Sequence, residues 1–200
     1  LQELLDFLNN SIFLNQIETT SIPNINLYMD QVLTFMNENL EHLKRNPNDK
    51  ILTKSMINNY VKNDIIPKPE NKKYFPNHII YLIYILSLKQ IVSLEDTQTL
   101  LKKYTHEHSD IKDMTDLYNN FLAIEKNDED RLVKEIEDLA ENLFTDNPFE
   151  NFDDDEIMFL FILLLSSRAN YYKIIVEKLI DNNFNKKEIK SSVKDKIKKP

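Results

Sequence analysis

Apolar residues recur at intervals of three and four along most of the chain, which predicts a protein built from helices. A short helix is expected over residues 1–14, followed by a polar connector over residues 15–26. The next helix is expected from about Leu27 to Lys44. Its apolar positions share one side of the helix: Met29, Val32, Leu33, Met36, Leu40 and Leu43.

The segment from Pro76 to Ile91 is apolar nearly all round, and a helix of that kind is expected in the middle of a core. Pro76 suits the first turn of this helix because its fixed φ is already helical. Ser93 and Asp96 then predict a capping box at the start of a helix that reaches about Tyr104.

Between these two helices, the stretch Leu52–Tyr74 predicts a short helix with two distinct faces. Thr53 stands at the N-cap position, and the helix is expected to end near Asn63. Its apolar arc, about 140° wide, contains Met56, Ile57, Tyr60 and Val61. The opposite arc carries amides, a hydroxyl and positive charge but no acid: Lys54, Ser55, Asn58, Asn59 and Lys62.

Residues 64–73, called the wing from here on, hold two prolines and cannot form a regular helix. Ile65 and Ile66 are expected to fix the near end of the wing to the core, while its lysine-bearing tip stays in solvent. A helix and a basic loop arranged in this order are typical of a nucleic-acid contact.

Beyond a boundary near Thr105–Asp110 the pattern predicts five more helices. They are expected over residues 111–121, 132–143, 153–168 and 171–180, and around Ile189, Val193 and Ile197. The apolar run Ile157–Leu165 is expected to be buried, and it is much shorter than the ~20 residues of a membrane helix. The acids of residues 128–130 and 153–156 are interpreted as charges at helix N-termini.

Composition excludes several classes of function. The chain has no glycine, which phosphate-cradling loops require, and no cysteine, which excludes disulfides and zinc–thiolate sites. His106 and His108 flank Glu107 without a third strong ligand nearby, so no metal and no cofactor are expected. We therefore expect no enzyme, no membrane insertion and a cytoplasmic location.

Charge is segregated along the chain, although the net charge is -8. Residues 44–103 hold eleven bases and five acids, a net +6, and residues 185–200 hold seven lysines and two acids, a net +5. The remainder is strongly acidic. A polyanion responds to local charge, so the overall acidity does not exclude DNA.

Three segments carry a resemblance to a known family: LYMDQVLTFMNENL, ILTKSMINNYVKNDIIPKP and KKYFPNHIIYLIYILSLKQIVSLED. They are similar to the bacterial family called domain of unknown function 1836, over roughly Leu27–Tyr104. That resemblance implies no activity.

The order of parts also resembles the MerR-like winged helix-turn-helix family. Ser55–Tyr60 matches the recognition helix, Ile66–Pro69 the wing, and Lys73–Tyr74 the basic-Tyr pair that precedes the next helix, while SLED resembles the start of the fourth helix. Asn58 stands where that family usually has Arg, only Tyr60 of its paired tyrosines is present, and the wing glycines are absent.

These observations predict an all-α protein with an N-terminal helix and connector at residues 1–26 and a MerR-like winged helix-turn-helix DNA-binding domain at 27–105. Residues 106–200 are predicted to form an acidic helical bundle domain with a basic C-terminal tail. The expected function is transcriptional regulation by binding double-stranded DNA as a homodimer, with the C-terminal helices serving dimerisation or a protein partner. The alternative is a protein-interaction module that keeps the layout without binding DNA. The predicted DNA contacts are Lys54, Ser55, Asn58, Asn59, Lys62, Lys68, Lys72, Lys73 and Tyr74.

Overall fold

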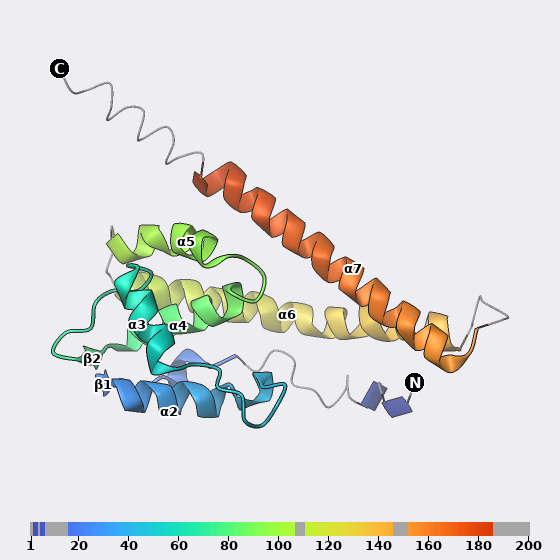
Figure 1. Cartoon of the computed structure of the whole chain (residues 1–200), viewed down its shortest axis with the longest axis horizontal. Coiled ribbons are helices and arrows are strands. Elements are labelled where there is room, and N and C mark those ends of the chain that lie inside the picture. Colours follow the sequence, from blue (N-terminus) through green and yellow to red (C-terminus); the bar gives the residue numbers. More distant parts are fainter. Residues whose placement is uncertain (1, 4, 7–15, 107–110, 146–151, 186–200) are drawn as a thin grey trace, which may run out of the picture. The chain divides into compact units, whose positions relative to one another are not determined.

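The computed structural model describes residues 2–3, 5–6, 16–106, 111–145 and 152–185. The protein is mostly helical and has one small two-stranded sheet, as Figure 1 shows. The elements in chain order are η1 (Thr19–Ser21), β1 (Leu27–Tyr28), α2 (Met29–Asn39), η2 (Glu41–Leu43), α3 (Lys54–Lys62), β2 (Lys73–Tyr74), α4 (Pro76–Leu88), α5 (Leu94–His106), α6 (Ile111–Phe144), α7 (Asp154–Ile180) and η3 (Asp181–Asn185).

The chain divides into two compact units, residues 17–119 with 173–200 and residues 1–16 with 120–172, and each is considered by itself. Most of the helix predicted over residues 1–14, and the whole of the one predicted around Ile189, lie outside the described residues.

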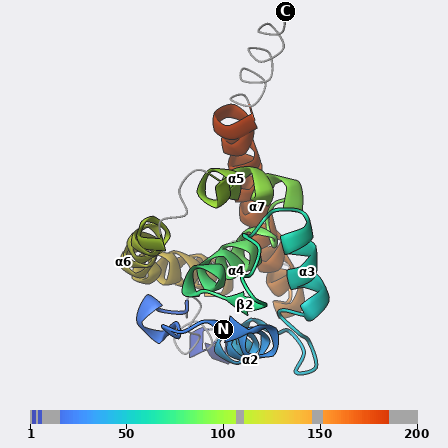
Figure 2. The ribbon, with the colours of Figure 1, turned by 90° about the vertical axis from the view of Figure 1, so that its left-hand side faces the viewer.

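Helix α4 forms the core of the unit that contains residues 17–119. All of its residues from His78 to Leu86 except Tyr84 are buried, which confirms the prediction from its apolar composition. Within this unit α4 lies between α2 and α5, with α3 to one side (Figure 2). Pro76 occupies the first turn of α4, and Ser93 Oγ accepts a hydrogen bond from the Asp96 N–H (3.0 Å) at the start of α5.

Helix α2 begins two residues later than predicted because Leu27 and Tyr28 form a strand. This strand, β1, pairs antiparallel with β2, with Leu27 opposite Tyr74 and Tyr28 opposite Lys73. The Tyr28 N–H donates to Gln31 Oε1 (2.9 Å), so the first turn of α2 is capped after the strand ends. The predicted all-α class is confirmed, and one short sheet at the base of the wing is added to it.

Helices α6 and α7 each replace two predicted helices. Residues 128–130 lie in the middle of α6, so the prediction that they mark a helix start is wrong. The segment contains neither proline nor glycine, and Asp128 forms an ion pair with Arg131 (2.7 Å), so nothing in the sequence ends the helix there. At the start of α7, Asp153 and Glu156 cap each other's backbone N–H groups (2.9 and 3.0 Å), which confirms the predicted capping role there.

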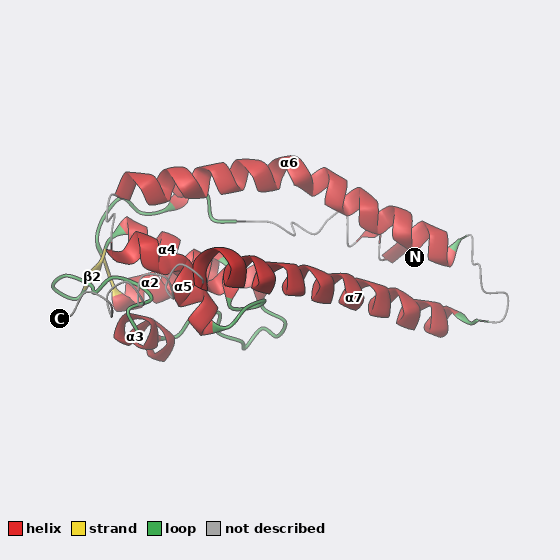
Figure 3. Cartoon of the chain, turned by 90° about the horizontal axis from the view of Figure 1, so that it is seen from above, coloured by secondary structure: helices red, strands yellow, loops and turns green. Residues whose placement is uncertain are grey.

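Within the unit of residues 120–172, the last turns of α6 and the first turns of α7 (Figure 3) pack through a small apolar cluster. The cluster is formed by Ala140, Leu143, Ile157 and Phe161. The rest of the run Ile157–Leu165 is largely exposed, with Phe159 at 61% and Ile162 at 52%. The prediction that the whole run is buried is wrong. By length and composition alone, residues 154–184 are also long and apolar enough to cross a membrane.

Candidate nucleic-acid interface

Helix α3 presents all five of its predicted polar side chains to solvent. Lys54, Ser55, Asn58, Asn59 and Lys62 are exposed. The opposite side packs into the core, where Ile57 and Tyr60 are buried, and burial raises the pKa of Tyr60. The helix therefore has an uncovered side with two amides and two lysines and no acid.

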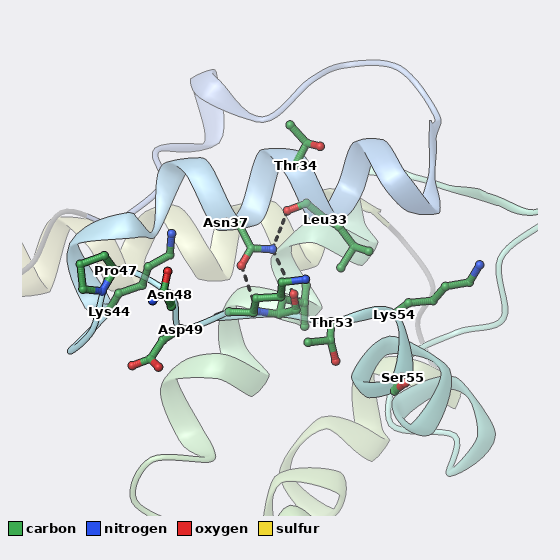
Figure 4. Close-up of a pocket in the computed structure, with 12 residues that line it drawn as sticks. Leu33, Thr34, Asn37, Lys44, Pro47, Asn48, Asp49, Thr53, Lys54 and Ser55 are labelled. Atoms are coloured by element: carbon green, nitrogen blue, oxygen red, sulfur yellow. Dashed lines mark hydrogen bonds between the residues drawn. The ribbon is translucent and has the colours of Figure 1, made fainter.

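The start of α3 is held by Thr53 and by an asparagine from α2. Thr53 Oγ1 accepts a hydrogen bond from the Met56 N–H (3.3 Å) and thus caps the helix. Asn37 binds the segment just before the cap, as Figure 4 shows. Its Oδ1 accepts from the N–H groups of Ile51 (3.0 Å) and Leu52 (3.3 Å), and its Nδ2 donates to the carbonyl of Leu52 (3.0 Å). A single side chain on α2 thereby sets the direction in which α3 begins.

An open pocket of about 730 Å³ lies between α2 and the first turn of α3. Lys44, Lys50 and Lys54 line it together with Asp49, so its charge is positive on balance. The amino end of α3 adds the partial positive charge of a helix terminus. The pocket thus extends the basic side of α3 toward α2.

The end of α3 adopts the two hydrogen bonds of a Schellman motif. The Ile65 N–H donates to the carbonyl of Tyr60 (2.9 Å), and the Asp64 N–H donates to that of Val61 (3.2 Å). Asp64 has φ 52°, the left-handed conformation that glycine usually supplies at this position. Gln98 of α5 also donates to the carbonyl of Asn63 (2.6 Å), so α3 is fixed at both ends.

The two asparagines on the exposed side of α3 differ in their hydrogen bonding. Asn59 Oδ1 accepts from Asn63 Nδ2 (2.9 Å), so its carboxamide is already bound within the protein. Asn58 makes no side-chain hydrogen bond to any described residue, so both its donor and its acceptor are available. Bidentate recognition of adenine requires both groups, and the geometry therefore favours Asn58.

The wing leaves the end of α3 and returns to β2 through a tight hairpin (Figure 1). Glu70 and Lys73 form a bridge around Asn71 (φ 52°) and Lys72 (φ 63°). Two positive φ angles at the central residues are what a type I′ turn requires. Lys68 and Lys72 are exposed, and Ile65 and Ile66 are buried as predicted.

At the base of the wing the two predicted contact residues are less accessible. Lys73 is half-buried, and its Nζ lies 5.2 Å from the centre of the Tyr28 ring in a cation–π contact. Tyr74 is buried, its ring stands edge-on to His78 at 5.5 Å, and burial raises its pKa. Tyr74 is therefore a core residue of this unit, and its ring does not form part of the exposed surface.

The comparisons place the chain in a family. Residues 17–121, more than half of the sequence, match the family described as "Domain of unknown function (DUF1836)". The chain belongs to the DUF1836 family. No curated protein and no solved structure matches it. The DUF1836 region includes α2 to α5 and the first part of α6, and it is wider at both ends than the resemblance noted in the sequence.

Within the DUF1836 region, Asn37, Gln98 and Tyr28 position α3 and the wing, and sequence patterns did not indicate them. Asn37 occupies a polar position of an amphipathic helix, and only the fold shows that it faces residues 51–52. No group of three or more His, Asp or Glu residues suited to a metal occurs in the described ranges. Of the residues 106–108, which were not expected to bind a metal, Glu107 and His108 lie outside those ranges.

Proposed function

We propose that this protein binds double-stranded DNA through α3 and the wing and acts as a transcriptional regulator. The observation that carries the proposal is the division of α3 into a buried side and an exposed side of amides and lysines without an acid. An α-helix fits the major groove of DNA, where amides and lysines contact base edges and phosphates. The order of helix, wing and basic-Tyr pair supports a MerR-like winged helix-turn-helix arrangement.

In this proposal the side chains have different tasks. Asn58 contacts a base edge, because its amide is unengaged among the described residues. Lys54 and Lys62, at the two ends of α3, contact phosphates or guanine. Asn59 and Ser55 line the same side, and Asn59 presents its free N–H while its oxygen stays bound to Asn63.

Lysines of the wing contact the DNA backbone and so fix the orientation of the protein without specifying sequence. Lys68 and Lys72 are exposed, and Lys72 stands at the hairpin tip. Lys73 contributes charge from above the Tyr28 ring. Tyr74 is left out of the contact set because its ring is buried.

A short recognition helix buries only a modest area on DNA, so one copy is expected to bind weakly. Two copies in a homodimer bind two half-sites and supply the missing affinity. The homodimer therefore belongs to this proposal.

The proposal is tested by measuring the affinity of the full chain for duplex DNA at several salt concentrations. The logarithm of the association constant is expected to fall linearly with the logarithm of salt, by about 0.9 per phosphate contact. Lys68→Ala with Lys72→Ala should reduce that slope by about two. The matched control is Lys126→Ala with Lys134→Ala, which removes the same charge from exposed positions of α6 and should leave the slope almost unchanged.

Sequence readout is tested on a site selected from random duplex. Asn58→Ala should weaken binding to that site by roughly 1–3 kcal/mol and leave random DNA unaffected, whereas Asn59→Ala should have a smaller effect. Absence of binding to any duplex at ~50 mM salt would contradict the proposal. It would favour a protein-interaction module instead.

A further inference from the structure

The open pocket between α2 and the first turn of α3, called the α2–α3 pocket from here on, is bordered by a strongly basic segment. Residues 44–54 carry four bases and one acid, a net +3. Three of the bases, Lys44, Lys50 and Lys54, line the pocket. Lys44 and Lys50 are not among the DNA contacts predicted from the sequence, so the pocket brings new basic groups to the edge of α3.

The single acid of this segment is already bound within its own loop. Asp49 Oδ2 accepts hydrogen bonds from the Asn46 N–H (3.0 Å) and from Asn46 Nδ2 (3.1 Å). Lys50 and Lys54 form no ion pair with any described residue, and Lys44 pairs with Glu41 (3.2 Å), whose side chain is 73% exposed. Exposed ion pairs are weak. All three ammonium groups can therefore turn to an external anion.

The basic groups of the pocket are spread along it. Lys44 and Lys54 stand at opposite ends of the pocket, as Figure 4 shows. An inorganic phosphate ion is too small to contact both ends. A strand of duplex DNA carries one negative charge every ~3.4 Å along the helix axis, so its successive phosphates can reach lysines placed along a groove. The spread of charge thus fits a polyanion better than a single small anion.

We propose that the α2–α3 pocket holds the sugar-phosphate backbone of the duplex that α3 contacts, and that Lys44 and Lys50 bind its phosphates. This inference rests on the proposed function and adds α2 and the loop of residues 44–51 to the contact with DNA. The N–H groups of Lys54 and Ser55, the first two of α3, have no partner inside the helix and supply further donors at the same end.

The pocket and the wing lie at opposite ends of α3. The pocket borders the first turn of α3, whereas the wing begins at Asp64, just after the last residue of the helix, Lys62. Nine residues at about 1.5 Å each make α3 about 13 Å long, close to the ~12 Å width of the major groove. With α3 in that groove, the pocket and the wing can contact the backbones on its two sides.

The loop that carries these lysines is held in place by bonds within the protein. Asn37 binds the N–H groups of Ile51 and Leu52, and the Asp49 N–H donates to the carbonyl of Asn46 (3.0 Å). A surface that is already ordered loses little conformational freedom on binding. Little of the attraction between lysines and phosphates is therefore offset by ordering of this loop.

The salt dependence of duplex binding by the full chain tests the pocket. Lys44→Gln with Lys50→Gln removes two charges and keeps polar side chains of similar reach. It should lower the slope of the logarithm of the association constant against the logarithm of salt by about two. The matched control is Lys126→Gln with Lys134→Gln at exposed positions of α6, which should leave the slope almost unchanged. Circular dichroism checks that each variant keeps its helix content.

A change of charge with little change of shape gives a second test that spares the lysines. Asn48 is exposed and lines the pocket, so Asn48→Asp places a negative charge beside the proposed phosphates. This change should weaken duplex binding several-fold at ~50 mM salt, and the loss should shrink as salt screens the charge. Asn39→Asp adds the same charge at an exposed position of α2 outside the pocket, and it should weaken binding less.

Uncharged linkages in the DNA locate the contact. Single methylphosphonates along a selected site should weaken binding of the wild-type chain at two groups of positions, one on each side of the groove that α3 occupies. The Lys44 and Lys50 changes should abolish the effect of one group, and Lys68→Ala with Lys72→Ala should abolish that of the other. Inorganic phosphate at about 1 mM and constant ionic strength should not compete with duplex.

The outcomes separate this inference from the proposed function. A slope that the wing changes lower and the pocket changes leave intact would overturn the inference alone. So would methylphosphonate effects that the pocket and the wing share, or competition by inorganic phosphate, which would assign the pocket to a small anion. Absence of duplex binding at ~50 mM salt would overturn both proposals.

Discussion

Asn37 is the side chain on which the position of α3 depends most directly, and Asn37→Ala is the change that tests this. The substitution removes three hydrogen bonds to the segment that leads into α3, two to N–H groups and one to a carbonyl. It removes one further bond to the carbonyl of Leu33 (2.8 Å), within α2 itself. Alanine keeps the helical preference of α2, so the effect reports on the lost bonds.

The expected cost follows from the number and burial of these bonds. A hydrogen bond of this kind contributes roughly 0.5–1.5 kcal/mol, so three give roughly 1.5–4.5 kcal/mol. They are only partly buried, and water replaces some of them in the variant. We therefore expect the free energy of unfolding of the unit to fall by about 2 kcal/mol.

Hydrogen exchange measures both the local and the global effect. The Ile51 and Leu52 amides should lose protection in Asn37→Ala, and the slowest amides of α4 should report the loss of global stability. Asn39→Ala is the matched control, because Asn39 lies on the same helix and makes one exposed bond to the carbonyl of Phe35 (2.8 Å); it should cost less than about 0.5 kcal/mol. Unchanged exchange at Ile51 and Leu52 in Asn37→Ala would refute the role assigned to Asn37.

Four further predictions concern the same unit. Tyr84 has a buried hydroxyl with no hydrogen-bond partner among the described residues, and burial raises the pKa of this hydroxyl to about 12. Tyr84→Phe should therefore leave the free energy of unfolding unchanged or raise it by up to about 1 kcal/mol. Tyr118→Phe should instead lower it by about 1–2 kcal/mol in urea unfolding, because Tyr118 donates to the Ile17 carbonyl (2.8 Å). Lys72→Gly should stabilise the wing by about 0.5–1 kcal/mol, since glycine suits φ 63° after Asn71, while weakening DNA binding; a loss of stability would contradict the type I′ turn. Burial lowers the pKa of His78, so just below pH ~6.5 the unfolded chain binds more protons than the folded chain does. The melting temperature should therefore fall as the pH drops through that value, and His78→Gln should reduce this fall.

The short helix α3 was predictable from sequence because all the determinants of its form are local. Thr53 caps it, apolar residues at helical spacing define its buried side, and the prolines of the wing exclude a helix through residues 67–69. Its positioning was not predictable, because Asn37 and Gln98 act from 15 and 35 residues away. The hydrogen bond that occupies Asn59 comes from the cap residue Asn63, which a helical pattern alone does not reveal.

The errors in the second half of the chain have a common physical origin. Clusters of acids favour helix N-termini, but they do not end a preceding helix, so residues 128–130 stay helical within α6 while Asp153 does cap α7. Backbone geometry and capping determine where a helix ends, and the charge of a segment is a weak indicator of that position.

The exposed run of α7 shows a second limit of pattern analysis, because an apolar segment indicates that a surface needs cover without indicating which molecule provides it. Inside one chain α6 can cover only the side that carries Ile157 and Phe161, since a single neighbouring helix contacts a single stripe. The side of α7 that carries Phe159 and Leu163 stays exposed.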